Sequence, residues 1–285
     1  MKVLVTGGAG FIGTNLIKRL LKEGHEVVSW DNYSTGLKGN ELKHKNVQYH
    51  DKDITKLIGA FNENYYDVVY HLAAIARIQP SFEKPVDYFD TNAMATMKLA
   101  KMCADANIPL IYAGSSSHHS GKYKNPYTFS KDIGEEIIQL FQQHYNLKAT
   151  VVRFYNVYGP YHLKGGGYTT LIGAWEKRVE KGLPLMIYGD GTKRRDFTHV
   201  DDIVDGLVLV NTKQAWNSTF ELGRGLNYSV KEIADAFGAE VEYGKNKPGE
   251  ADITLCTDVT AREVLGWNPQ KDIINYIKEY LSCKK

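Results

Sequence analysis

The chain begins Met1-Lys-Val-Leu-Val-Thr-Gly-Gly-Ala-Gly-Phe-Ile-Gly13 and reaches a second apolar run at Glu26-Val-Val-Ser-Trp-Asp31. The aliphatic residues before Thr6 predict a buried strand, and the helical spacing of apolar residues over 11–21 predicts a helix. Three glycines mark the junction of the two: Gly7, Gly10 and Gly13. The order is strand, glycine turn, helix, strand and acidic residue, which is typical of the first unit of a parallel α/β sheet.

This unit has the chemistry that a dinucleotide requires. Glycines let the backbone approach a pyrophosphate closely, and a helix N-terminus offers it free N–H groups and a partial positive charge. Asp31 ends the second strand, where its carboxylate can accept both hydroxyls of an adenosine ribose and repels a 2′-phosphate. The alternative is an ordinary turn with a solvated aspartate, but the complete context favours nucleotide binding. We therefore predict NAD rather than NADP as cofactor.

Composition excludes several classes of protein. A chain of 285 residues can bury a sizeable core, as one large domain or two joined ones. Its net charge of +2 gives no argument for a nucleic-acid partner or a membrane surface. No signal peptide or bilayer-length apolar run is recognised, and Cys103, Cys256 and Cys283 have no metal-like spacing. These features predict a cytoplasmic protein with reduced thiols.

Alternation of strand and helix patterns predicts a Rossmann-type, doubly wound parallel sheet with a smaller C-terminal lobe. We expect a dinucleotide-binding domain over residues 1–160, with returning segments near 189–215. Residues 161–188 and 216–285 should form a substrate-binding lobe. The expected strands after the opening unit are 47–50, 68–72, 110–113, 149–154, 185–188, 220–222 and 241–243. The expected helices are 86–107, 127–145, 169–181, 200–211, 230–237, 261–265 and 273–281.

A tyrosine and a lysine four residues apart form the second motif, Tyr127-Thr-Phe-Ser-Lys131. Residues at this spacing share one face of a helix. A free phenol has a pKa of about 10, and a nearby ammonium together with the positive ring of bound NAD⁺ would favour the phenolate. Ser115, at the end of a predicted strand, can hydrogen-bond both a substrate oxygen and this phenol. An exposed helix turn and a polar loop are the alternative interpretation.

The chain resembles the extended short-chain dehydrogenase/reductase family, in particular its nucleotide-sugar epimerases and dehydratases. The resemblance runs nearly from end to end. Its motifs are Thr6-Gly-Gly-Ala-Gly-Phe-Ile-Gly13, Asp31-Asn-Tyr-Ser-Thr-Gly36, Asp53-Ile54, His71-Leu-Ala-Ala74, Asn92, Tyr127…Lys131, Arg153-Phe-Tyr-Asn-Val-Tyr-Gly-Pro160, Tyr188-Gly-Asp-Gly191, Arg195-Asp-Phe-Thr-His-Val-Asp-Asp202 and Pro248-Gly-Glu250.

The resemblance implies roles for particular residues. Tyr127, Lys131 and Ser115 would be catalytic. The implied NAD-binding residues are Gly7, Gly10, Phe11, Ile12, Gly13, Asp31, Asn32, Ser34, Asp53, Ile54, Leu72, Ala73, Ala74, Asn92, Tyr127, Lys131 and Tyr155. The implied substrate-binding residues are Ser115, Ser116, Asn156, Tyr188, Arg195 and Lys247. Arg195 would grip the substrate diphosphate, since a fork of donors suits phosphate oxygens. A homodimer is also implied.

The resemblance favours 4-epimerisation of a UDP-hexose, such as UDP-glucose, UDP-galactose or their N-acetyl forms, through a 4-keto intermediate. Similar dehydratases carry an Asp-Glu pair after the catalytic hydroxyl residue, where this chain has Ser116 and Ser117. The alternatives are a GDP- or dTDP-sugar 3,5-epimerase/reductase or dehydratase, and, from another class, a catalytically idle NAD-binding sensor.

Two departures from the family bear on the substrate. Residues 116–126 form a shorter loop than in relatives, and Lys247 stands where an arginine usually adds a diphosphate contact, although a point charge clamps less well than a fork. His118, His119 and His162 have no acidic or cysteine partners at ligand-like spacing, so we predict no metal site.

Overall fold

The computed structural model describes residues 1–284 and is built around a seven-stranded parallel sheet with strand order β3-β2-β1-β4-β5-β6-β9. The order reverses direction at β1 and β4, the point at which doubly wound sheets bind ligands at their carboxyl ends. The strands are β1 (Lys2–Thr6), β2 (Glu26–Asp31), β3 (Val47–Asp51), β4 (Val68–His71), β5 (Leu110–Ser115), β6 (Ala149–Phe154) and β9 (Ser218–Leu222). The predicted Rossmann-type architecture is confirmed.

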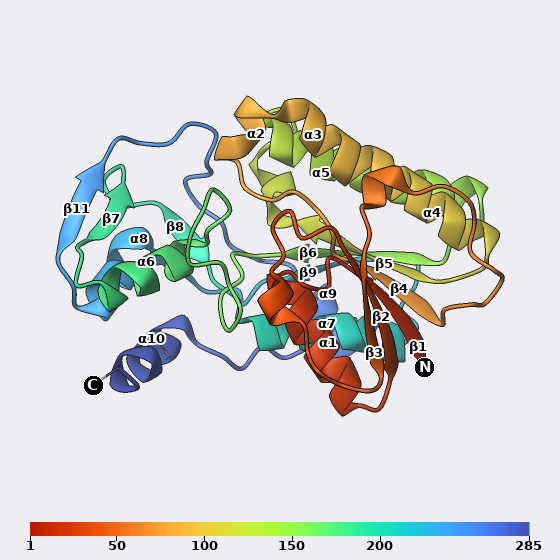
Figure 1. Cartoon of the computed structure of the whole chain (residues 1–285). Coiled ribbons are helices and arrows are strands. Elements are labelled where there is room, and N and C mark those ends of the chain that lie inside the picture. The colour runs from red at the N-terminus through yellow and green to blue at the C-terminus, as the bar shows by residue number, and fades with distance from the viewer. Residues whose placement is uncertain (285) are drawn as a thin grey trace.

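Helices cover both faces of this sheet, and Figure 1 shows the two layers above and below it. On one face, α4 (Ala95–Asp105) and α5 (Pro126–His144) bury Leu99 and Ile138. On the other lie α1 (Phe11–Lys22), α7 (Val200–Thr212) and α9 (Thr260–Leu265). The central strands are therefore enclosed, and Val3, Leu4 and Val5 of β1 are fully buried, as a two-sided parallel sheet requires, whereas the edge strand β3 is partly exposed.

A smaller lobe stands beside the carboxyl edge of the sheet (Figure 1). Its core includes Trp175, Ile187, Ile233 and Ile277. Two short sheets pair β7 (Leu185–Tyr188) with β11 (Val241–Gly244), and β8 (Arg194–Asp196) with β10 (Asn227–Ser229). Its helices are α6 (Leu171–Glu180), α8 (Val230–Phe237) and α10 (Ile273–Ser282). β8 and β10 are not predicted by the sequence, because each is only three residues long.

The predicted lobe boundary differs from the one that the structure draws. β9 lies inside the segment assigned to the lobe, but it pairs with β6 and completes the large sheet. α9 packs on the same sheet through Ala261 and Leu265. Conversely, β8 falls within the expected returning segment and pairs with β10 of the lobe. The chain therefore passes between the large sheet and the smaller lobe more often than the sequence pattern predicts.

The single helix expected over 86–107 is interrupted. The segment holds α3 (Pro85–Phe89), the π-turn η3 (Asp90–Met94) and α4, and a further short helix, α2 (Gln79–Glu83), precedes it. Pro80 and Pro85 stand in the first turns of α2 and α3, where a missing N–H is tolerated. Three short 3₁₀ turns, η1 (Lys38–Asn40), η2 (Ile54–Lys56) and η4 (Ser116–Ser120), complete the elements. Within residues 1–284, no helix combines the length and apolarity that a bilayer crossing needs.

Candidate active site

One large cleft of about 1470 Å³ lies along the carboxyl ends of the strands, between the sheet and the smaller lobe. The turn after β1, the end of β2, the loop after β4 and the end of β5 form its first wall. Residues 163–170 and the end of β7 form the opposite wall. The two predicted motifs, far apart in sequence, therefore face the same space.

The glycine turn at one end of the cleft leaves no room for side chains. A Cβ on Gly13 would lie 2.1 Å from the carbonyl oxygen of Gly7, and one on Gly7 would lie 2.8 Å from the backbone nitrogen of Ala73. Gly7 also has φ +74°, which favours glycine. α1 begins beyond Gly10 with no side-chain cap, so its first N–H groups face the cleft without a side-chain partner. This cradle fits a pyrophosphate.

Asp31 is held at the end of β2 by two backbone N–H groups. Ala9 donates to one carboxylate oxygen at 3.0 Å and Tyr33 to the other at 2.8 Å. Burial raises the pKa of Asp31, while these donors act in the opposite direction. A Cβ at Gly36 would come within 2.8 Å of the carboxylate, so the glycine keeps this side open. A fixed carboxylate next to the glycine cradle suits a ribose with two free hydroxyls.

Most residues expected to hold the dinucleotide line the same cleft. Besides the cradle and Asp31 they are Phe11, Ile12, Asn32, Ser34, Asp53, Ile54, Leu72, Ala73, Ala74, Tyr127 and Lys131. Asp53 accepts a hydrogen bond from the Thr55 backbone and so orders the turn that carries Ile54. The protein's own residues therefore fit NAD: Asp31 would hold the adenosine ribose, and Tyr127 and Lys131 would stand at the nicotinamide end.

Two expected NAD-binding residues do not line this cleft. Asn92, which is buried in η3, bonds the backbone of Ile75 with both ends of its amide and donates to Ser130. It orders the loop after β4 rather than facing the dinucleotide. The hydroxyl of Tyr155 donates to Glu221 at 2.7 Å, and the ring borders a smaller neighbouring cavity. For both residues, the direction of the side chain could not be deduced from the sequence.

Ser115, Tyr127 and Lys131 meet at the middle of the cleft. Asn125 caps α5 and Pro126 begins it, which places Tyr127 in the first turn. The Tyr127 hydroxyl donates to Ser115 Oγ at 3.3 Å. Lys131, only 3 % exposed, donates from Nζ to the carbonyl of Ala113, which lies on β5. The end of β5 and the first turns of α5 thus bring together the three residues that the sequence analysis predicts to be catalytic.

Burial dominates the proton affinities of this group. It raises the pKa of Tyr127, while the hydrogen bond to Ser115 and the charge of Arg77 lower it. It lowers the pKa of Lys131 to about 7, against the opposing charges of Glu135 and Asp132. Lys131 is not among the groups that shift the pKa of Tyr127 in this structure. The other half of the expectation, the positive nicotinamide ring, would favour the phenolate when NAD is bound.

Behind Lys131 lies a network of buried charges. Arg153 pairs with Glu135 at 2.6 Å and with Glu221 at 2.9 Å, and His119 also contacts Glu221 at 2.8 Å. Ligand atoms of His118, Asp132 and Glu135 lie within 4.8 Å of one another. The sequence spacing did not suggest this triad, because folding brings its members together. Since Arg153 already neutralises Glu135, the absence of a metal stays our prediction.

The residues expected to bind substrate also line this cleft. Ser116, Asn156, Tyr188, Arg195 and Lys247 all line it. Arg195 is steadied by the carbonyl of Arg194 at 2.9 Å and lies 3.5 Å from Glu250. Lys247 Nζ lies 3.6 Å from the centre of the Tyr188 ring. Asn156 donates to the carbonyl of Asp196, which ties the loop after β6 to β8.

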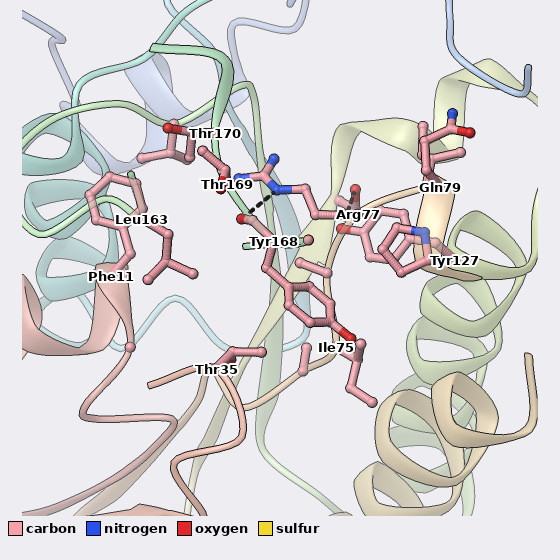
Figure 2. Close-up of a pocket in the computed structure, with 18 of the residues that line it drawn as sticks. Phe11, Thr35, Ile75, Arg77, Gln79, Tyr127, Leu163, Tyr168, Thr169 and Thr170 are labelled. Atoms are coloured by element: carbon pink, nitrogen blue, oxygen red, sulfur yellow. Dashed lines mark hydrogen bonds between the residues drawn. The ribbon is translucent and has the colours of Figure 1, made fainter. Parts of the chain in front are cut away.

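Arg77 and Tyr168 are cleft residues that the sequence analysis does not predict. Figure 2 shows Arg77 reaching toward the 163–170 segment, where its Nε donates to the carbonyl of Tyr168 at 3.0 Å. Only the position of Arg77 in the loop after β4, six residues beyond His71, could have suggested it. Tyr168 follows a run of three glycines, which predicts an irregular loop rather than a ligand-facing ring.

Comparison with known proteins agrees with this geometry. The model of the NAD dependent epimerase/dehydratase family matches residues 3–223. The chain belongs to this family. It is 31% identical to a putative UDP-glucose 4-epimerase of Methanocaldococcus jannaschii, over 99% of this chain and 98% of that protein. It is also 31% identical to a UDP-glucuronate 4-epimerase of Thermodesulfobacterium geofontis, over 99% of this chain and 95% of the relative.

The fold of a solved epimerase matches the whole chain. The UDP-glucuronic acid 4-epimerase of Bacillus cereus, in complex with UDP-glucuronic acid and NAD, superposes with a TM-score of 0.88 at 25% identity and covers 100% of both chains. As a member of this family, the chain is an NAD-dependent enzyme. The glycine cradle and Asp31 are the parts of the fold that fit the dinucleotide.

Proposed function

We propose that this epimerase interconverts UDP-sugars that differ in configuration at C4. The observation that carries the proposal is the Ser115–Tyr127 pair, which lines one cleft together with Lys131, the glycine cradle and Arg195. A nucleotide sugar whose diphosphate lies at Arg195 can extend its sugar to Tyr127. The relatives' names add support, since they include epimerases of UDP-glucose and of UDP-glucuronate.

The residues perform a reversible proton transfer. Tyr127, as phenolate, removes the proton of the sugar 4-hydroxyl, and Ser115 holds that oxygen in place by a hydrogen bond. Bound NAD would supply the acceptor and donor of the C4 hydride. The cleft would need to let the 4-keto sugar turn, so that its opposite face is presented to the cofactor. Tyr127 then gives the proton back, and no group is consumed.

Lys131 acts on the Tyr127 phenol through its positive charge. Its Nζ is anchored by the carbonyl of Ala113 and lies 4.1 Å from the centre of the Tyr112 ring. A buried cation in this position stabilises negative charge in the site, because the low local dielectric strengthens the interaction. We assign Arg195 to the diphosphate, and Tyr188 with Lys247 to the nucleotide end of the substrate.

The residues after Ser115 favour epimerisation over dehydration. Elimination of a hydroxyl from C6 needs an additional acid and base beside the sugar, whereas Ser116 and Ser117 supply neither. Ser117 Oγ instead lies 2.9 Å from Ser115 Oγ, so its hydroxyl belongs to the same hydrogen-bond chain. A 3,5-epimerase would likewise need to remove carbon-bound protons, which a 4-epimerase does not.

The test is to incubate the NAD-loaded enzyme with UDP-glucose, UDP-galactose, their N-acetyl forms, UDP-glucuronate and UDP-galacturonate, and to identify products by NMR in D₂O. We expect one C4 epimer pair to interconvert without deuterium at carbon. Tyr127→Phe should lower the rate by about 10²- to 10⁴-fold while still binding NAD. Deuterium at C3 or C5 would establish the alternative chemistry, and no conversion of any sugar would refute the proposal.

We also propose that the enzyme is a cytoplasmic homodimer. Cys103, Cys256 and Cys283 are free thiols, which suits a reducing compartment. Met94 and Leu140, on the layer of η3, α4 and α5, are 48% and 45% exposed and offer apolar surface for a second copy. Sedimentation of the wild type and of Leu140→Glu tests this interface, and a monomeric wild type would refute it.

A further inference from the structure

Arg77 has an unusual backbone for an arginine. It lies in the loop after β4, lines the cleft, and has φ +89°. Side chains other than that of glycine are strained in this region, at a cost of about 1–3 kcal/mol, and such strain clusters at functional sites. Two hydrogen bonds hold the loop in place, because the hydroxyl of the fully buried Tyr88 contacts the carbonyl oxygens of Ala76 and Arg77 at 2.9 Å each.

The guanidinium of Arg77 is not paired with any acid of the described part of the chain. Its Nε donates to the carbonyl of Tyr168, and no carboxylate oxygen of residues 1–284 forms an ion pair with it within 4.0 Å. Glu83, Asp87 and Asp90 also line the cleft but do not reach it. Burial lowers the pKa of Arg77, and the charges that oppose this effect are the phenols of Tyr127 and Tyr88. The terminal nitrogens thus offer donors that no described acid neutralises.

These donors lie near the reacting end of the sugar. Arg77 and Tyr127 line the same cleft, and the charge of Arg77 acts to lower the pKa of Tyr127. The Tyr88 ring, whose hydroxyl fixes the Arg77 loop, makes an edge contact with the Tyr127 ring at 6.2 Å between centres. In Figure 2 both Arg77 and Tyr127 border the same part of the cleft. A substituent next to the 4-hydroxyl would therefore meet Arg77.

We propose that Arg77 recognises a carboxylate carried on C5 of the sugar, so that the enzyme acts on UDP-uronic acids. The inference rests on the proposed function and names its substrate class. C5 adjoins C4, and a group on C5 therefore lies beside a hydroxyl bound to Tyr127. A guanidinium presents parallel N–H donors that match the two oxygens of a carboxylate, whereas a hydroxymethyl group would leave its charge unpaired.

Binding without turnover tests the recognition directly. In Tyr127→Phe loaded with NAD, calorimetry compares UDP-glucuronate with UDP-glucose, which differ only in the group on C5. We expect UDP-glucuronate to bind at least about tenfold more tightly, a difference typical of one charge-assisted hydrogen-bond pair. Adding Arg77→Gln should remove this difference, whereas Arg19→Gln, which removes an equal charge from the outside of α1, should preserve it.

The alternative is that Arg77 serves only to tune Tyr127. In that case Arg77→Gln in the otherwise native enzyme would shift the pH profile of kcat equally for both sugars and leave their affinities equal. Equal binding of the two sugars by the Tyr127→Phe enzyme, or equal weakening of both by Arg77→Gln, would overturn the proposal. Arg77→Gly, which suits the positive φ, provides a second variant should the glutamine form fold poorly.

The outcomes separate this inference from the proposed function. Selective binding of UDP-glucuronate without conversion of any UDP-sugar would refute the epimerase and retain the role of Arg77. Interconversion of UDP-glucose and UDP-galactose with no preference for the acidic sugars would support the epimerase and overturn the role of Arg77. Wild-type kcat/KM for each sugar therefore completes the experiment.

Discussion

Replacing Lys131 with methionine should raise the stability of the NAD-free protein at neutral pH while it destroys catalysis. Lys131 is 3 % exposed, and burial lowers its pKa from 10.5 to about 7. Methionine is similar in length and can occupy the same space without a charge. The substitution therefore removes the cost of burying an ammonium together with the group that acts on Tyr127.

The size and the direction of the effect follow from proton linkage. Between pH 7 and 10.5 the unfolded chain keeps the lysine proton while the folded chain loses it, so stability rises with pH over this window. A shift of one pKa unit corresponds to 1.36 kcal/mol, and the whole shift therefore amounts to roughly 5 kcal/mol. The advantage of Lys131→Met should be largest near pH 7 and should fade as pH approaches 10.5.

Urea unfolding at several pH values measures this difference. Subtracting the wild-type free energy from that of Lys131→Met cancels the other titrating groups, and Lys148→Met, an exposed lysine, provides the control. A stability difference that does not change between pH 7 and 10 would refute the reasoning. It would mean that Lys131 keeps its proton in the folded protein as readily as in the unfolded one.

Three further predictions concern the cradle and the buried charges. Gly13→Ala should abolish NAD binding measured by calorimetry, because its Cβ would lie 2.1 Å from a backbone oxygen, whereas Gly39→Ala, with nothing within 4 Å, should bind normally. Asp31→Asn should weaken NAD by about tenfold or more and narrow its advantage over NADP in the same assay. Arg153→Ala should lower the free energy of unfolding in urea by about 3–5 kcal/mol, since it takes the arginine away from buried Glu135 and leaves Glu221 only Tyr155 and His119; an unchanged midpoint would contradict this.

Local patterns predicted most of the fold. The central strands of the parallel sheet are buried on both faces, so each appears in the sequence as a short apolar run, and β6 was predicted to the residue. The helix of Tyr127 has its own start signal in Asn125-Pro126. The first cofactor residues follow one another in the chain, and their chemistry is local. These features depend on neighbours in sequence, which is why the sequence alone determined the Rossmann unit, the glycine cradle and the tyrosine–lysine pair to which we assign catalysis.

Tertiary structure decided where side chains point and which segments, far apart in sequence, line the same cleft. Tyr155 turns to Glu221, and Asn92 turns to the loop after β4, because each finds its hydrogen-bond partner in a segment far along the chain. β9 returns to the large sheet after the chain has already entered the lobe. The role that we propose for Arg77 follows only from its surroundings in the folded chain, which include Tyr168, Tyr88 and Tyr127. Such relations depend on long-range packing, and no local pattern encodes them.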